Sequence, residues 1–199
     1  TTGGAQDLAV TAGTGTITFG GAVGGGTPLG ALSLTGDEID LAGNVRGTGA
    51  LTLQPGTPGQ NIAIGGSDNN TPALDLTLTE LNKLQAGFSG ITIGRSIDGT
   101  GAVDVSGYTF KDDITIVGGS IAVNGLLSAV ANALTLTART GNIAVSGTAG
   151  IDAAAVTIAL NAIVATFTIF SAADVSATSG GVTVSAVKMH VAGTIAANG

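Results

Sequence analysis

Short segments in which two aliphatic residues flank one small residue recur along the whole chain. Because successive side chains of a β-strand point to opposite faces, the aliphatic residues are predicted to face inward and the central residue to face water. Most neighbouring segments lie roughly 15 to 26 residues apart, the range of solenoid repeats. They occupy residues 32–34, 51–53, 76–78, 91–93, 114–116, 134–136, 156–158 and 182–184.

A second series of similar segments lies between the first, so each turn of the chain is predicted to carry at least two strands. Glycine pairs and prolines separate the strands, as expected at the corners of a solenoid. The pattern predicts an all-β, right-handed parallel β-helix (β-solenoid) of about nine or ten coils, a rod about 45 Å long. The second series occupies residues 39–41, 62–64, 103–105, 121–123 and 143–145.

One stretch departs from this pattern and predicts a short helical excursion near residues 79–86. Thr79 is a plausible N-cap, Glu80 supplies an acid in the first turn, and Leu81 and Leu84 have helical spacing. An antiparallel β-sandwich is the alternative fold. It is disfavoured because it needs larger inward residues and more two-residue Asn-Gly or Asp-Gly turns.

Composition agrees with a thin core. The chain has 34 glycines, five phenylalanines, one tyrosine and no tryptophan, so few large side chains are available to fill a wide interior. No stretch of about 20 residues is free of polar residues, so no transmembrane segment is expected. The net charge of −7, with six scattered Lys and Arg residues, argues against a nucleic-acid partner. Cysteine is absent, which excludes disulfides and thiolate metal sites.

Two stretches resemble repeats of filamentous-haemagglutinin-like exoproteins, the large bacterial adhesins of the two-partner-secretion type. They are residues 7–24 (DLAVTAGTGTITFGGAVG) and residues 76–95 (LTLTELNKLQAGFSGITIGR). The second half of the chain is similar only in its general coil pattern. The resemblance implies a secreted or cell-surface β-solenoid of a Gram-negative or related bacterium that serves adhesion, aggregation or sheath formation.

Few residues are candidates for catalysis or metal binding. His190 has no carboxylate neighbour in the sequence and is interpreted as an outward strand residue. The acidic residues that come closest to a catalytic pair, Asp37, Glu38, Asp40, Asp112 and Asp113, lie where turn hydrogen bonding is expected. We therefore expect no enzyme and no cofactor. Calcium is a weak alternative at Asp68, Asn70 and Asp75, which supply oxygen ligands without the order of an EF-hand.

The outward threonines form a candidate binding surface. In the solenoid they are predicted to stack on one face, although one threonine per strand is also explained by β-propensity alone. Tyr108, in the loop excursion 108–113, is a further candidate for ligand contact, as is the excursion 54–71. The threonines are Thr52, Thr77, Thr92, Thr115, Thr135, Thr157 and Thr183.

These patterns predict that residues 1–199 form one solenoid segment of a longer repetitive protein. Neither end has a polar capping sequence, so we expect the chain to continue covalently or to stack end to end with copies of itself. The expected function is that of a structural or adhesive surface rod, located outside the cell. The alternatives are a glycan- or receptor-binding module that uses the loop excursions, with a host or cell-surface partner, and a polysaccharide-degrading β-helix.

Overall fold

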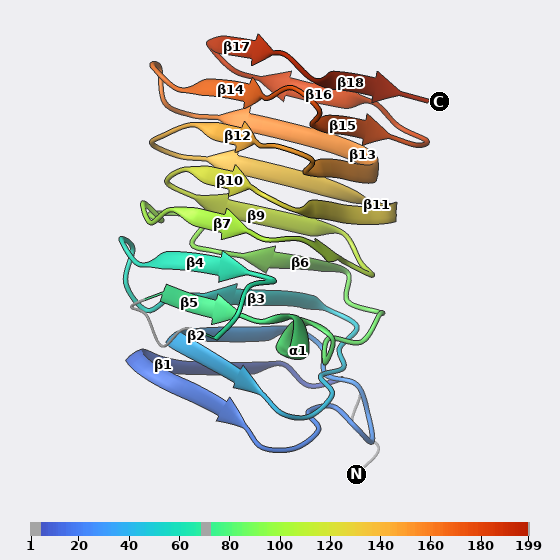
Figure 1. The fold of residues 1–199 in the computed structure, drawn as a ribbon. Helices are drawn as coiled ribbons and strands as arrows, with labels where there is room; N and C mark the ends of the chain where they lie inside the picture. Colours follow the sequence, from blue (N-terminus) through green and yellow to red (C-terminus); the bar gives the residue numbers. More distant parts are fainter. Residues whose placement is uncertain (1–4, 69–72, 199) are drawn as a thin grey trace.

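The computed structural model describes residues 5–68 and 73–198. Its strands stack one above another from β1 at the N-terminal end to β17 and β18 at the C-terminal end (Figure 1). Every pairing between the described strands is parallel, which confirms the β-solenoid and rules out the antiparallel sandwich. Representative pairs are β1 with β2, β6 with β9 and β12 with β14.

The chain makes about eight turns, fewer than the nine or ten that we expected. The reason is that a turn takes roughly 25 residues rather than 20, since several corners are long and one turn carries an excursion. At the usual strand spacing the rod is about 40 Å long.

Each complete turn has three faces. The first face contains the N-terminal parts of β1 (Leu8–Phe19) and β2 (Leu32–Leu41), the C-terminal parts of β11 (Leu126–Ala138) and β13 (Gly150–Leu160), and four short strands. These strands follow the aliphatic segments of the first sequence series, apart from residues 76–78. The four short strands are β3 (Ala50–Gln54), β6 (Gly90–Ile93), β9 (Ile114–Gly118) and β16 (Val182–Ser185).

The second face is a seven-stranded sheet in the order β17-β14-β12-β10-β7-β4-β5. The second sequence series lies on this side, with residues 39–41 on β2 and the other four segments in the sheet, as predicted. The strands of the sheet are β4 (Asn61–Ile64), β5 (Ala73–Leu76), β7 (Val103–Val105), β10 (Ile121–Val123), β12 (Ile143–Val145), β14 (Thr166–Ile169) and β17 (Lys188–Val191).

The third face was not resolved as a separate series in the sequence. It consists of β8 (Tyr108–Thr109), β15 (Asp174–Ala177) and β18 (Thr194–Ala197), together with the N-terminal parts of β11 and β13. The long strands β11 and β13 pass from the third face to the first, and their register shifts between Ala129 and Ala133. Ala131, with φ of 71°, lies at this bend.

Two aliphatic columns fill the interior behind the first face. Leu32, Leu51, Ile91, Ile114, Leu134 and Val156 follow one another in register, as do Leu34, Leu53, Ile93, Ile116, Leu136 and Ile158. All of these side chains are at most 3% exposed. The strand alternation therefore determines which residues form the core, as predicted from the sequence.

The helical excursion is present, but its start differs from the prediction. Helix α1 spans Leu78–Leu81, and its N-cap is Thr77 rather than Thr79. The Thr77 side chain accepts the Glu80 N–H, and the Glu80 carboxylate accepts the Thr77 N–H at 2.9 Å, so the two residues form a capping box. Residues 76–78 are consequently not a strand core: β5 ends at Leu76, and Leu78 is 47% exposed.

Candidate functional site

The outward threonines of the first face form a continuous ladder. Consecutive strands place Thr52 opposite Thr92, Thr92 opposite Thr115, and Thr115 opposite Thr135, and the series continues through Thr157 to Thr183. Ser33 extends the ladder at the N-terminal end because it pairs with Thr52. The predicted stacking is confirmed for these residues, with neighbouring rungs about 4.8 Å apart.

Thr77 is the exception among the predicted ladder residues. It caps α1, and its hydroxyl donates to the Glu80 carboxylate at 2.8 Å, so it contributes nothing to the first face. The sequence contained a signal for this outcome, since Thr77 and Glu80 have the Thr-x-x-Glu spacing of a capping box.

Mostly small residues precede the ladder threonines along the first face. The positions before the ladder are small on four strands, at Ala50, Gly90, Ala133 and Ala155, whereas the exposed Asp113 precedes β9. The role of the ladder as a binding surface stays a prediction.

Tyr108 is more constrained than a loop residue. Its hydroxyl donates to the Leu81 carbonyl at 2.8 Å, and its ring meets Phe110 edge-on, with the centroids 4.8 Å apart. Burial raises the pKa of Tyr108 above its usual value. The residue therefore holds α1 against the solenoid, and its role in ligand contact stays a prediction.

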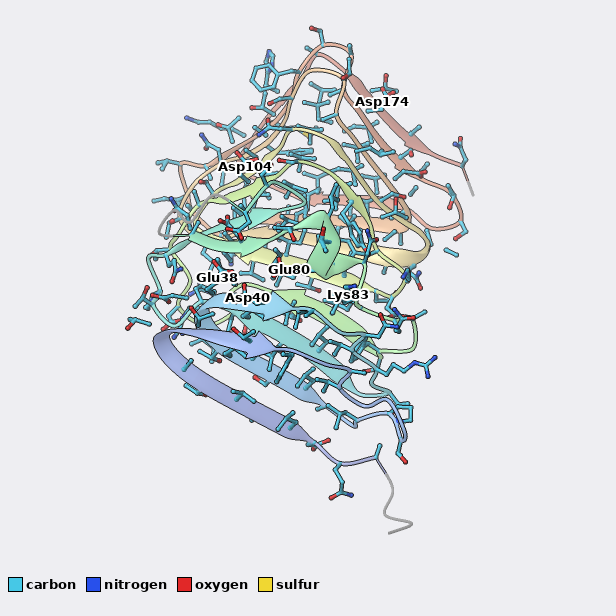
Figure 2. The ribbon with its side chains drawn as sticks, turned by 60° about the horizontal axis from the view of Figure 1, so that its bottom comes forward. Glu38, Asp40, Glu80, Lys83, Asp104 and Asp174 are labelled. Atoms are coloured by element: carbon cyan, nitrogen blue, oxygen red, sulfur yellow. The ribbon has the colours of Figure 1, made fainter. Side chains whose placement is uncertain are left out.

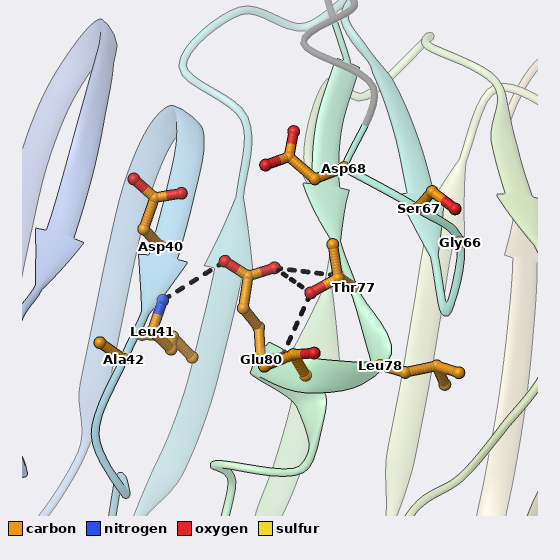
Figure 3. Close-up of a pocket in the computed structure, with 10 residues that line it drawn as sticks. Asp40, Leu41, Ala42, Gly66, Ser67, Asp68, Thr77, Leu78 and Glu80 are labelled. Atoms are coloured by element: carbon orange, nitrogen blue, oxygen red, sulfur yellow. Dashed lines mark hydrogen bonds between the residues drawn. The ribbon is translucent and has the colours of Figure 1, made fainter.

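A groove of about 540 Å³ lies where α1 meets β2 (Figure 3). Asp40 and Leu41 of β2 form one wall, and Thr77 and Glu80 form another. Ser67 and Asp68 complete the lining from the segment after β4. No sequence pattern connects these residues, because they lie up to about 40 positions apart and come together only through the excursion.

Glu80 joins α1 to the solenoid. One carboxylate oxygen, Oε2, accepts the Thr77 N–H and hydroxyl, and the other, Oε1, accepts the Leu41 N–H at 3.4 Å (Figure 3). Asp40 is also engaged, since the Thr18 hydroxyl donates to it at 3.0 Å. The carboxylates of Asp40 and Glu80 in the groove therefore already accept hydrogen bonds from other parts of the chain.

Glu38 lies close to this groove without lining it, and Figure 2 shows it near Asp40 and Glu80. Burial raises the pKa of Glu38 to about 7, and the carboxylates of Asp75, Asp40 and Glu80 add to the rise. A hydrogen bond from the Ile39 N–H, 3.0 Å long, opposes it. Glu38 is therefore partly protonated near neutral pH.

The weak metal candidates are not brought together as a site in the described part of the chain. Asp68 lines the groove, Asp75 is 3% exposed within β5, and Asn70 lies outside the described residues. No group of three or more His, Cys, Asp or Glu residues with metal-binding geometry occurs within residues 5–68 and 73–198. Calcium binding stays a prediction.

Three of the other acidic residues accept hydrogen bonds from backbone N–H groups, as predicted from their positions at turns. Asp37 accepts the Gly56 N–H at 2.9 Å, and Asp113 accepts the Ala133 N–H at 2.8 Å. Asp112 accepts the N–H groups of Gly87 and Phe88. His190 is exposed on β17, in register with Thr168.

Comparison of the chain with protein-family models, curated proteins and solved structures found no significant match. The resemblance to filamentous-haemagglutinin-like exoproteins therefore stays a prediction. Among the described helices, none has the length and apolar character needed to cross a bilayer.

Proposed function

We propose that this chain is a segment of a structural, adhesive β-solenoid that acts at a bacterial cell surface through its length and its ends. The observation that carries the proposal is the state of the inward-facing residues in the last turn. Met189, Val191 and Ile195 are 55%, 41% and 37% exposed. Their register partners one turn below, Phe167, Ile169 and Val175, are completely buried.

The first turn is open in the same way. Leu8 and Val10 are only partly buried, whereas their partners Leu32 and Leu34 on β2 are 1% and 0% exposed. A further layer would cover the apolar side chains and pair the edge of each end strand. That layer can be another turn of the same polypeptide or the opposite end of a second copy.

In a head-to-tail contact between copies, aliphatic residues of the last turn would stack on aliphatic residues of the first turn. The last turn presents Val182 and Val184 in the two inward columns, and the first turn presents Leu8 and Val10 in the same columns. Such a contact is heterologous and does not close on itself, so it produces a filament and lets surfaces that carry the chain adhere to one another.

Substitution of Val191 by lysine tests the proposal, because it places a charge in the exposed inward column of the last turn. We expect the wild-type chain to show concentration-dependent association in sedimentation velocity and to aggregate coated beads. Val191→Lys should lose both properties while its circular dichroism spectrum is unchanged. The control, Ser185→Lys, places the same charge on an exposed outward position of the last turn and should associate like the wild type.

A wild-type chain that stays monomeric at every concentration and leaves coated beads dispersed would contradict the proposal. So would equal loss of association in Val191→Lys and Ser185→Lys, since that result would show a general effect of charge rather than contact through the open turn.

A further inference from the structure

The two ends of the rod carry side chains of opposite charge. Beyond Asp174 the only titratable side chains are those of Lys188 and His190, and both point outward from β17 at the C-terminal end (Figure 1). Residues 1–45, in contrast, contain four acidic side chains and no basic one. Two of these acids, Glu38 and Asp40, point outward from β2 near the N-terminal end (Figure 2).

The basic side chains of β17 have no ionic partner in the described part of the chain. In register below them on β14 lie Thr166, opposite Lys188, and Thr168, opposite His190. Neither Lys188 nor His190 forms an ion pair with a described residue, and both side chains are exposed. They are therefore available to a layer that stacks on the last turn.

β1 and β17 present the same alternation to such a layer. In residues 189–191 of β17 the outer two side chains belong to the inward columns and His190 points outward. Residues 17–19 of β1 alternate in the same way and pair with residues 39–41 of β2. Joining the columns of the second face end to end therefore places His190 of one copy opposite Thr18 of the next.

The lengths of the corners allow the columns of the first and second faces to be joined at the same time. Seven positions separate Val182 from Met189 in the last turn, and seven separate Leu32 from Ile39 in β2. β1 has two more residues over the corresponding stretch, and the register shifts within residues 11–16 absorb them. The last turn therefore has the geometry of the layer that already packs on β1.

We propose that the partner of the open last turn is the first turn of a second copy, held head to tail so that the basic outer side of β17 faces the acidic outer side of β2 across β1. This inference rests on the proposed association through the ends and adds its polarity and register. Two last turns in contact would bring Lys188 against Lys188, and two first turns would bring Asp40 against Asp40. Like charges repel, so charge selects the heterologous contact over both isologous ones.

The opposite charges lie close enough to attract each other. The Asp40 carboxylate already reaches the first turn, since the Thr18 hydroxyl of β1 donates to it at 3.0 Å. Only β1 would separate the strands that carry Lys188 and Asp40, so their backbones would be about 10 Å apart, close to the Debye length at 0.1 M salt. Within the rod, Arg139 reaches over such a distance, because it donates to the Ser96 carbonyl at 2.7 Å although β9 lies between their turns.

Disulfide cross-linking tests the polarity and the register, because the chain has no cysteine of its own. Ala9 and Thr183 are exposed outward positions at the two ends of the column that contains Ser33 and Thr157. In the proposed contact they lie opposite each other at about 4.8 Å, which suits a disulfide. A mixture of Ala9→Cys and Thr183→Cys should therefore form heterodimers under mild oxidation, whereas neither variant alone should cross-link. As a control, Thr115→Cys, in the middle of the rod, should not cross-link with Ala9→Cys.

Charge exchange tests the ionic contact. At about 50 mM salt, Lys188→Glu should weaken association by about 3- to 10-fold, because it replaces an attraction by a repulsion. Lys188→Glu combined with Asp40→Lys restores opposite charges at the wild-type net charge and should recover the wild-type affinity. Sedimentation velocity measures these affinities, and at about 500 mM salt the differences should largely disappear.

Several results would overturn the inference and leave association through the ends intact. One is cross-linking within each single-cysteine variant but not in their mixture, which would show isologous contacts. Another is a Lys188→Glu variant that associates as tightly as the wild type at low salt, or a charge exchange that recovers nothing. A wild-type chain that does not associate at all would overturn both proposals.

Discussion

Aspartate side chains bind backbone N–H groups of several loops of this rod, and Asp112 is the buried example. Its side chain is 9% exposed and accepts hydrogen bonds from the N–H groups of Gly87, at 2.9 Å, and Phe88, at 3.2 Å. These two residues follow the α1 excursion and lead into β6, and Phe88 is itself 5% exposed. A single side chain thus determines where the excursion rejoins the solenoid.

Replacement of Asp112 by alanine should lower the free energy of unfolding by about 1 to 3 kcal/mol, because it removes the acceptor of the N–H of buried Phe88 as well as that of the Gly87 N–H. Urea unfolding followed by circular dichroism measures the change. Asp174→Ala, at an exposed position, should change the unfolding free energy by less than about 0.5 kcal/mol. Equal effects of the two substitutions would show that the Asp112 contacts contribute little.

At the scale of the element, neighbouring turns approach so closely that some corners accept only glycine. A Cβ atom on Gly101 would overlap the carbonyl oxygen of Gln60 in the turn below, and one on Gly125 would overlap the carbonyl oxygen of Ser106. Neither glycine has a positive φ, so the requirement is one of space. At these corners the backbones of successive turns are in direct contact.

We expect Gly101→Ala to destabilise the chain by about 1 to 3 kcal/mol, since the overlap involves backbone that can move only together with its turn. Gly59→Ala is the matched control, because the nearest atom to its added Cβ is the Thr100 hydroxyl oxygen at 3.8 Å. Thermal unfolding of both variants tests the pair. An unchanged melting temperature in Gly101→Ala would contradict the close-contact explanation.

At the scale of the whole molecule, the core is one elongated column, so each layer depends mainly on the layers directly above and below it. Ile116, in the middle of the rod, is 0% exposed between Ile93 and Leu136. Ile195, in the last turn, has a neighbouring layer on one side only and is 37% exposed. An isoleucine in the middle of the rod therefore contributes more to the free energy of unfolding than an isoleucine in the last turn.

Truncation of these two isoleucines measures that difference. Ile116→Ala should cost about 2 to 5 kcal/mol of unfolding free energy, because it opens a cavity between two complete layers. Ile195→Ala should cost less than about 1 kcal/mol in the monomer. If the chain associates through its ends, the cost of Ile195→Ala should increase with protein concentration, which denaturant titrations at several concentrations would detect.

The sequence by itself determined the fold class and the inward and outward sides of most strands. A strand alternates with a period of two whatever lies around it, so Thr52, Thr92 and Thr115 had to face away from their aliphatic neighbours once parallel stacking was assumed. The role of some corner residues was also predicted from the sequence, since Asp37 and Asp113 bind backbone N–H groups near turns.

Only the tertiary structure decided which distant residues meet. β5 steps back to the N-terminal side of β4, which places α1 beside β2, so that Glu80 accepts the Leu41 N–H, and the folding of the excursion brings Asp112 to Gly87. The number of turns and the presence of a third face also became clear only from the tertiary structure. The physical reason is that alternation is a local property of the backbone, whereas the register between turns depends on corner lengths and on packing between residues about 20 to 40 positions apart.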